Sequence, residues 1–181
     1  RFHGVGQEGG PGDPGGDARV LLESLQGLGP VVDVDDLVVR QDEKLLERGY
    51  TVKAMSRSEE KVKTLLGDAP NLQVVYGDMR DPSTLPAALK DVDAVCCVTG
   101  TTAFPSKRWQ NGNDPENTDY IGVKNLIKST PKDMKRFVLT TSAGVERYNQ
   151  LPFNILNLFG VLKYKRMAEQ ELEASGLPYT I

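Results

Sequence analysis

Segments with the pattern of β-strands alternate with segments with the pattern of α-helices from residue 50 to the end of the chain. The expected strands are residues 50–55, 72–76, 92–99, 136–141 and those from 179 onward. The expected helices between them are residues 58–66, 83–89, 116–128 and 162–175. The run at 92–99 is almost entirely apolar, as expected of a central parallel strand covered on both faces. This alternation predicts an α/β fold with a doubly wound parallel sheet.

The first 30 residues have a different composition from the rest of the chain. Seven glycines and two prolines lie between Gly4 and Gly16, with too few apolar residues to support a packed core. We therefore expect residues 1–30 to be a disordered or non-native glycine-rich segment, with at most a short helix at 19–26. We expect residues 31–181 to form one incomplete domain, atypical at its N-terminal side and truncated at its C-terminus within the last strand.

Charge and hydropathy exclude several classes of partner. The net charge is −3 and the isoelectric point is near 5.3, which argues against nucleic acid as the main partner. No apolar run is long enough to be a transmembrane segment. The adjacent Cys96 and Cys97 fall on one expected strand, where neighbouring side chains point to opposite faces, so we expect two buried thiols rather than a disulfide.

One glycine-rich string imitates a nucleotide-binding loop. Residues 4–9 match the dinucleotide pattern G-x-G-x-x-G. That pattern binds a pyrophosphate only when a strand precedes it and a helix begins directly after it. Neither is expected here, because Pro11, Pro14 and further glycines follow. We predict no phosphate site at this string.

The end of the strand at 50–55 carries the first candidate cofactor residues. In a Rossmann sheet this position lies beside the adenosine ribose, where an acidic residue favours NAD and an arginine accommodates the 2′-phosphate of NADP. Arg57 stands here, flanked by the hydroxyls of Ser56 and Ser58. The sequence therefore favours NADP over NAD. The alternative is a solvated arginine at the start of an exposed helix.

Three further strands end in residues suited to ligand contacts. Asp78 and Met79 follow the strand at 72–76, where they can contact an adenine ring, or where Asp78 can instead cap the turn before Pro82. Gly100 and Thr101 follow the central strand, and a glycine there permits close backbone approach to a ligand. Ser142 follows the strand at 136–141, at a position suited to polarising a substrate carbonyl.

The tyrosine that usually completes such a catalytic set is missing. A Tyr-x-x-x-Lys spacing would place both side chains on one face of a helix. Lys165 has Val161 four residues before it, and Lys163 has Phe159. Tyr164 points about 100° around the helix from Lys165, as its neighbouring position dictates. The conventional apparatus for hydride transfer is therefore incomplete.

Taken together, these segments resemble the atypical short-chain dehydrogenases of the NmrA-like, NAD(P)-binding kind, and plant plastid members most closely. The segments that carry the resemblance are residues 45–50, 57, 77–81, 93–95, 122–126, 135–142, 165–169 and 175–181. The resemblance implies cofactor contacts from Arg57, Asp78, Met79, Gly100 and Thr101. It also implies that Ser142 and Lys165 occupy active-site positions, with Val161 in place of the tyrosine.

The chain departs from this family before residue 45. The family's first strand and glycine loop are expected at about residues 30–39, where this chain has Val32, Asp35, Asp36 and Val38 instead of glycines. Carboxylates repel a pyrophosphate, and side chains block close backbone approach. The abrupt change near Lys44 suggests a frame error or an alternatively spliced start.

Two functions fit these features. The first is an NADP(H)-binding Rossmann protein that acts as a reductase of an unknown small molecule. The second is a non-catalytic scaffold or NADP(H) sensor that binds a redox protein, and the missing tyrosine favours it modestly. The resemblance implies a chloroplast location; without it, a cytoplasmic location would be expected.

Overall fold

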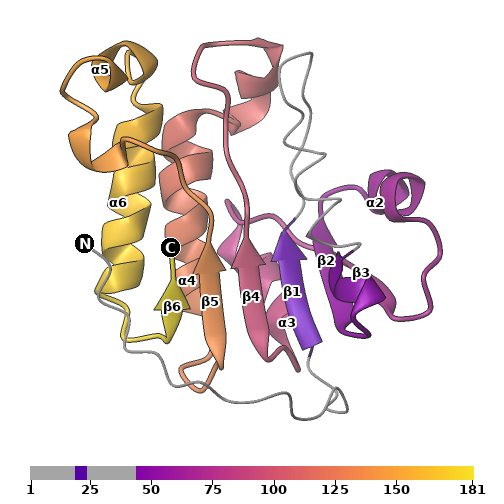
Figure 1. Ribbon diagram of the computed structural model, residues 1–181. Helices are drawn as coiled ribbons and strands as arrows, with labels where there is room; N and C mark the ends of the chain where they lie inside the picture. Colours follow the sequence, from indigo (N-terminus) through magenta and orange to yellow (C-terminus); the bar gives the residue numbers. More distant parts are fainter. Residues whose placement is uncertain (1–18, 24–43) are drawn as a thin grey trace.

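The chain forms a six-stranded parallel sheet with helices packed against it (Figure 1). The computed structural model describes residues 19–23 and 44–181. The strands are β1 (Arg19–Glu23), β2 (Thr51–Ser56), β3 (Leu72–Tyr76), β4 (Ala94–Cys97), β5 (Arg136–Leu139) and β6 (Tyr179–Thr180). Their order across the sheet is β3-β2-β1-β4-β5-β6, and every neighbouring pair is parallel. This order is that of a doubly wound Rossmann sheet, so the predicted fold class is confirmed.

Helices and helical turns connect the strands. They are α2 (Glu59–Leu66), η1 (Pro82–Thr84), α3 (Leu85–Leu89), η2 (Lys107–Gly112), η3 (Glu116–Gly122), α4 (Val123–Ser129), η4 (Val145–Arg147), α5 (Phe153–Leu156) and α6 (Val161–Glu173). The segment η3 is a π-helical turn that continues directly into α4. Among the described residues, no helix is both long and apolar enough to cross a bilayer.

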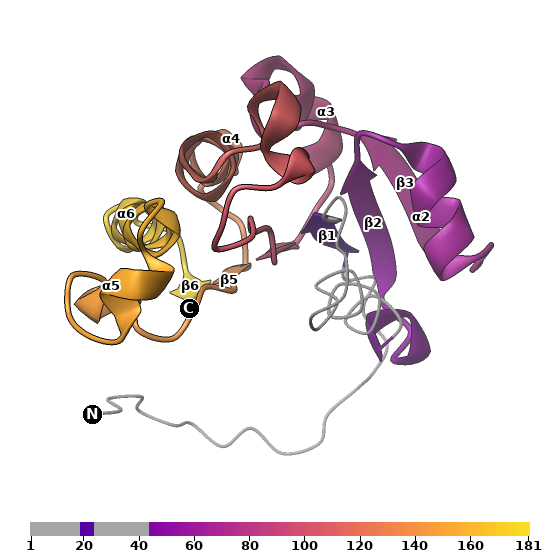
Figure 2. The same cartoon turned by 90° about the horizontal axis from the view of Figure 1, so that it is seen from above.

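The main core lies between the sheet and the helices α3, α4 and α6, which line one face (Figure 2). Phe137 and Met55 from the strands and Leu126 and Leu172 from the helices are among its fully buried side chains. A smaller cluster, built around Val52 and Cys96, forms a second apolar group. Cys96 and Cys97 belong to different clusters and are buried thiols that form no disulfide, as the alternation along the strand predicted.

The central strand β1 corrects the prediction for the N-terminal residues. Arg19–Glu23 is a strand, not part of a short helix, and it pairs with both β2 and β4. The sheet therefore takes one strand from within residues 1–30, a segment expected to lie outside the domain. Its three apolar residues are too few to show a period in the sequence, and the two partner strands determine its conformation. The glycine-poor stretch at 30–39 lies outside the described residues.

Candidate functional site

The predicted site residues lie in loops that follow the carboxyl ends of four neighbouring strands. Arg57 and Ser58 follow β2, Asp78 and Met79 follow β3, Gly100 and Thr101 lie shortly after β4, and Ser142 lies shortly after β5. Parallel strands end at a common edge, which Figure 1 shows at the arrowheads. In open α/β sheets, ligands bind at this edge. The fold thus brings these segments, distant in sequence, to the expected place.

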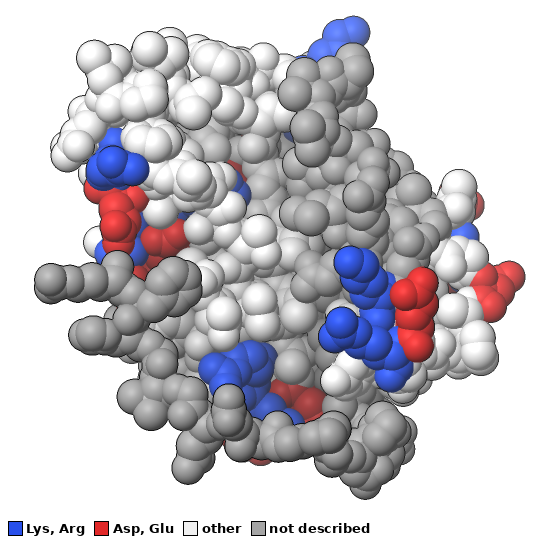
Figure 3. All heavy atoms as spheres, in the orientation of Figure 1, with Lys and Arg blue, Asp and Glu red and all other residues white. Residues whose placement is uncertain are grey.

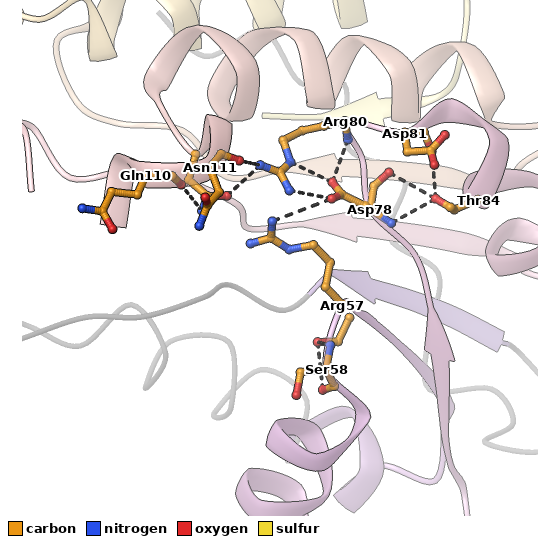
Figure 4. Close-up of polar contacts among 10 residues, drawn as sticks. Arg57, Ser58, Asp78, Arg80, Asp81, Thr84, Gln110 and Asn111 are labelled. Atoms are coloured by element: carbon orange, nitrogen blue, oxygen red, sulfur yellow. Dashed lines mark hydrogen bonds and ion pairs between the residues drawn. The ribbon is translucent and has the colours of Figure 1, made fainter. Parts of the chain in front are cut away.

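Asp78 is held by Arg80 through several hydrogen bonds (Figure 4). The Arg80 Nη2 lies 2.6 Å from Asp78 Oδ2, and both Arg80 Nε and the Arg80 backbone N–H donate to Oδ1. These bonds lower the pKa of the Asp78 carboxyl, mainly through the Arg80 side chain and against an opposing effect of burial. The same contact raises the pKa of Arg80. Asp78 is therefore an ionised carboxylate fixed in one orientation.

Arg57 approaches the same carboxylate from β2. Its Nη1 lies 3.7 Å from Asp78 Oδ2, and the side chains of Arg57 and Asp78 are 25% and 16% exposed. Ser56 fixes the bend of the backbone at Arg57: its Oγ accepts from the Ser58 backbone N–H and donates to the Ser58 carbonyl. We call Arg57, Asp78 and Arg80 the arginine cluster. It holds two guanidinium groups and one carboxylate, a formal charge of +1.

Arg80 is a member of this cluster that sequence reasoning missed. Its Nη1 donates to the Asn111 carbonyl at 2.7 Å and to Asn113 Oδ1 at 3.0 Å, which ties η2 to the loop after β3 (Figure 4). Asn111 has a positive φ of 60°, so its carbonyl points in a direction that a regular helix would not give. Its position two residues after the candidate Asp78 is the feature of the sequence that could have indicated its role.

Met79 is placed differently from the expectation. Its side chain is 3% exposed and belongs to the main core, beside Gly122, where an added Cβ would lie 3.0 Å from Met79 Cβ. The Met79 carbonyl accepts from Asn125 Nδ2 at 3.0 Å. The side chain is thus packed in the core, and its contact with an adenine ring stays a prediction.

Lys165 lies in a buried ion pair. Its Nζ is 2.7 Å from Asp119 Oδ1, and the two side chains are 9% and 0% exposed. It also donates to the Thr99 carbonyl at 3.3 Å. Asp119 further accepts from the backbone N–H and the hydroxyl of Thr101. We call Thr101, Asp119 and Lys165 the lysine cluster, and its formal charge is zero.

Asp119 was missed because it lies within an expected helix, where a single aspartate predicts a solvated face. The π-helical turn η3 instead places it at the end of β4. Gly100 lies beside it, and a Cβ there would lie only 2.8 Å from Lys165 Nζ. Within the described part of the chain, the buried hydroxyl of Thr99 has no hydrogen-bond partner. The end of β4 therefore combines a close-approach glycine with an unsatisfied polar group.

The region after β5 contains Ser142 and faces the part of α6 where the tyrosine of the usual catalytic set is missing. Ser142 is half-buried, and its neighbour Thr141 donates to Glu169 Oε1 at 2.6 Å, which joins the loop to α6. Val161 is buried at the start of α6. Tyr164 turns away and donates to Glu116 Oε2 at 3.0 Å; burial and this carboxylate raise its pKa. Tyr164 therefore does not replace the missing tyrosine.

An apolar surface surrounds α5 at the same edge of the sheet. Its large exposed side chains are Phe104, Leu151, Ile155, Leu156, Leu158 and Phe159. Leu151 and Leu158 are 74% and 70% exposed, and Phe159 meets both Phe104 and Trp109 edge to face. Figure 3 shows few charged side chains over this corner of the molecule. Exposed apolar surface of this kind marks sites of ligand or protein contact.

Comparison with known proteins identifies the family of the chain. The sequence profile described as NAD(P)H-binding matches residues 41–181. The chain is 34% identical to protein TIC 62, chloroplastic, of Pisum sativum, over 76% of this chain and 28% of that protein. It is 30% identical to sanguinarine reductase of Eschscholzia californica, over 90% of this chain and 67% of that protein. It spans about half or less of the plant chloroplast relatives that it matches.

A similar fold is found among solved structures. The enzyme WbmH of Bordetella bronchiseptica, solved in complex with NAD+, superposes with a TM-score of 0.67 and 24% identity, over 90% of this chain and 53% of that one. At this identity the likeness concerns the fold. The profile match, together with the parallel sheet, shows that the chain belongs to the NAD(P)H-binding family of atypical short-chain dehydrogenases.

Proposed function

We propose that the chain binds NADP(H) along the carboxyl edge of its sheet and prefers it to NAD(H). The arginine cluster receives the adenosine half with its 2′-phosphate, and the lysine cluster faces the ribose and nicotinamide half. The observation that carries this proposal is the partly exposed pair of guanidinium groups around Asp78, at the ends of β2 and β3. Family membership supports a nicotinamide dinucleotide as the ligand.

The charge of the arginine cluster suits a phosphate. Arg57 holds Asp78 only at 3.7 Å, whereas Arg80 holds it at 2.6 Å. Both guanidinium groups are partly exposed, so a phosphate can contact them from the solvent side while Arg80 keeps Asp78 compensated. Charge-assisted bonds from a guanidinium fork to phosphate oxygens are strong and directional. Ser58 lies beside Arg57 and can add a hydroxyl donor.

The catalytic proposal is reduction of a small molecule. NADPH supplies a hydride, and the residues of this chain then have to orient the substrate and provide polar contacts. Ser142, after β5, is suited to donating a hydrogen bond to a substrate carbonyl. Lys165 provides an ammonium group, which is paired with Asp119. Because Val161 stands in place of the tyrosine, solvent water has to supply the proton that completes the reduction.

A non-catalytic role is the second candidate. The apolar surface around α5 and the buried Val161 favour a scaffold or NADP(H) sensor that binds a redox protein. Relatives described as chloroplastic support a plastid location. NADPH oxidation across a panel of quinones and aldehydes separates the candidates: turnover that Ser142→Ala abolishes supports the reductase, and tight binding without turnover supports the scaffold.

Calorimetric titration tests the cofactor assignment. We expect NADPH to bind the wild-type chain at least about tenfold more tightly than NADH, because one charge-assisted hydrogen bond to the 2′-phosphate contributes about this difference in affinity. Arg57→Ala should remove this preference and leave NADH affinity unchanged. Arg48→Ala, an exposed arginine before β2, is the matched control. Equal binding of NADH and NADPH by the wild type, or full NADPH affinity in Arg57→Ala, would refute the assignment.

A further inference from the structure

Arg108, in η2, carries a guanidinium group that neither the arginine cluster nor the lysine cluster uses. Its Nη1 is buried and has no hydrogen-bond partner. In the part of the chain that the structure describes, this guanidinium forms neither a hydrogen bond nor an ion pair. A buried donor without a partner is uncommon in folded proteins and calls for an explanation. The side chain as a whole is half-buried, so a ligand can approach the group from its exposed side.

The carboxylates that follow Arg108 most closely in the sequence have other partners. Asp114 accepts from the backbone N–H of Asn117 at 2.9 Å and from its side-chain amide at 2.7 Å. Glu116 accepts from the Tyr164 hydroxyl at 3.0 Å. An arginine remains charged at neutral pH, and its fork of N–H donors suits an anionic oxygen group. A carboxylate matches the single charge of Arg108, whereas a phosphate monoester carries more than one charge.

The turn that carries Arg108 also belongs to the apolar surface around α5. Ser106 Oγ accepts from the Arg108 backbone N–H at 3.3 Å, and the Ser106 carbonyl accepts from the Trp109 backbone N–H at 3.1 Å. The Trp109 indole N–H donates to the Thr102 hydroxyl at 3.1 Å, and its ring meets Phe159 edge to face at 5.9 Å between centroids. One short turn therefore holds the guanidinium next in sequence to an aromatic ring of this surface.

The apolar surface is uncharged in sequence and rich in aromatic rings. Neither residues 101–106 nor residues 148–160 include Asp, Glu, Lys or Arg. Phe104 and Phe159 are 48% and 41% exposed, and their centroids are 6.0 Å apart. Rings that meet edge to face gain from their electrostatic geometry, so such a surface favours an aromatic ligand over an aliphatic one of the same size. The complement of this surface and Arg108 is an aromatic ring that bears one negative charge.

The apolar surface borders the loop that carries Ser142. The ring of Phe153, in α5, packs directly against Gly144, two residues after Ser142. Phe159 lies two residues before Val161, the position at which the tyrosine of the usual catalytic set is missing. A ligand held on this surface therefore lies close to the residues proposed for catalysis.

We propose that the substrate is an aromatic carbonyl compound with a carboxylate group, and that Arg108 binds this carboxylate. The aromatic ring lies against Phe159 and Trp109. This inference rests on the reductase function proposed above, for which it names the substrate class.

An NMR titration of the full chain with three matched probes tests the proposal. Trp109 is the only tryptophan of the chain, so its indole N–H gives a single resonance within the proposed site. Phenylacetate carries the ring and the carboxylate, phenylacetamide lacks the charge, and cyclohexylacetate lacks the aromatic ring. We expect phenylacetate to bind at least about tenfold more tightly than the amide, through one charge-assisted hydrogen bond. It should bind about threefold more tightly than cyclohexylacetate, through the aromatic contacts.

Three variants separate the charge from the ring. Arg108→Met should abolish the preference for acid over amide, and it should not lower the free energy of unfolding, because it removes a buried donor without a partner. Lys107→Met removes the neighbouring exposed cation and should leave the preference as in the wild type. Phe159→Leu should weaken phenylacetate and phenylacetamide alike, by about threefold, with the preference for the acid unchanged.

The result that would overturn the anion site is equal binding of phenylacetate and its amide, or an undiminished preference in Arg108→Met. Cyclohexylacetate that bound as tightly as phenylacetate would overturn the aromatic assignment. A marked loss of stability in Arg108→Met would assign the guanidinium to folding instead. The probes bind without cofactor, so the two proposals fail separately. A chain that bound phenylacetate but not NADPH would overturn the cofactor assignment alone, and a chain that bound only NADPH would overturn this inference alone.

Discussion

The arginine cluster and the lysine cluster lie along the same edge of the sheet but differ in burial and charge. In the arginine cluster, Arg57 and Asp78 are 25% and 16% exposed, and two cations share one anion. In the lysine cluster, Lys165 and Asp119 are 9% and 0% exposed, and one cation meets one anion. The three members of the first cluster are partly exposed and carry a formal charge of +1, whereas the ion pair of the second is buried and neutral.

The difference in burial and charge determines which kind of group each cluster can attract and how rigidly its side chains are held. A partly exposed surplus charge attracts an anionic group, and it costs little to maintain because water screens it. A buried ion pair attracts no anion, and it is costly to disturb because either partner alone would be an uncompensated charge. One end of the site is therefore suited to ligand selectivity, and the other to precise orientation.

The largest effect is expected in the lysine cluster. Asp119→Asn leaves the Lys165 ammonium buried without a counter-ion, and we expect the free energy of unfolding to fall by about 3–5 kcal/mol. Equilibrium unfolding in urea, followed by circular dichroism, measures this loss. Asp119→Asn combined with Lys165→Met should recover most of it, because no lone charge remains. A loss in the single variant below about 1 kcal/mol, as is typical of exposed pairs, would remove the distinction between the clusters.

A smaller effect is expected from Arg80 in the arginine cluster. Arg80→Met keeps the aliphatic stem but removes the hydrogen bonds to Asp78, Asn111 and Asn113. We expect a loss of about 1–2 kcal/mol in the free energy of unfolding, because water replaces these bonds at a partly exposed site. Hydrogen exchange of the amides at 107–113 should accelerate, while Arg48→Met leaves it unchanged. A loss as large as that of Asp119→Asn would contradict the comparison.

The sequence predicted the sheet well because strand and helix periods are properties of local segments. The strand at 72–76 was predicted to the residue, and those at 50–55 and 136–141 to within two residues. The strand β1 was not predicted, since its pairing with β2 and β4 depends on contacts with distant segments. A run of three apolar residues between Arg19 and Glu23 has no period of its own.

The candidate site was predicted only in part, for a related reason. Residues directly after strands, such as Arg57 and Asp78, are found by position, because the end of a parallel strand lies at the ligand edge. Asp119 lies in a helical segment, and only the π-helical turn directs it to Lys165. The burial of Met79 was not foreseen, because its neighbour Asp78 is partly exposed while Met79 belongs to the core. The direction of a side chain in a loop depends on packing that the sequence does not display.

A third effect tests how tightly the lysine cluster is packed. In Gly100→Ala, the new Cβ lies 2.8 Å from Lys165 Nζ, which Asp119 and the Thr99 carbonyl hold in place. We expect a loss of about 1–2 kcal/mol in the free energy of unfolding, as for overpacking of a filled site. In a Lys165→Ala background the same substitution should cost almost nothing, which a double-mutant cycle measures. An equal cost in both backgrounds would locate the strain elsewhere.

The smallest effect is a pH dependence that the exposed cluster should show. The pKa of Asp78 is lowered in the folded chain, chiefly by its hydrogen bond from Arg80. The stabilisation is therefore complete above the pKa of the unfolded state, near 3.8, and is lost as the pH falls through the folded value. Since Asp78 is partly exposed, we expect this stabilisation to contribute only about 1 kcal/mol to the free energy of unfolding.

The difference in unfolding free energy between the wild type and Asp78→Asn should be constant from pH 7 to about 5 and shrink below about 4. Asp133→Asn, which removes an exposed carboxylate outside the arginine cluster, is the control. A difference for Asp78→Asn that grew as the pH fell would reverse the sign of the assigned interaction, and the arginine cluster would then lose its fixed carboxylate.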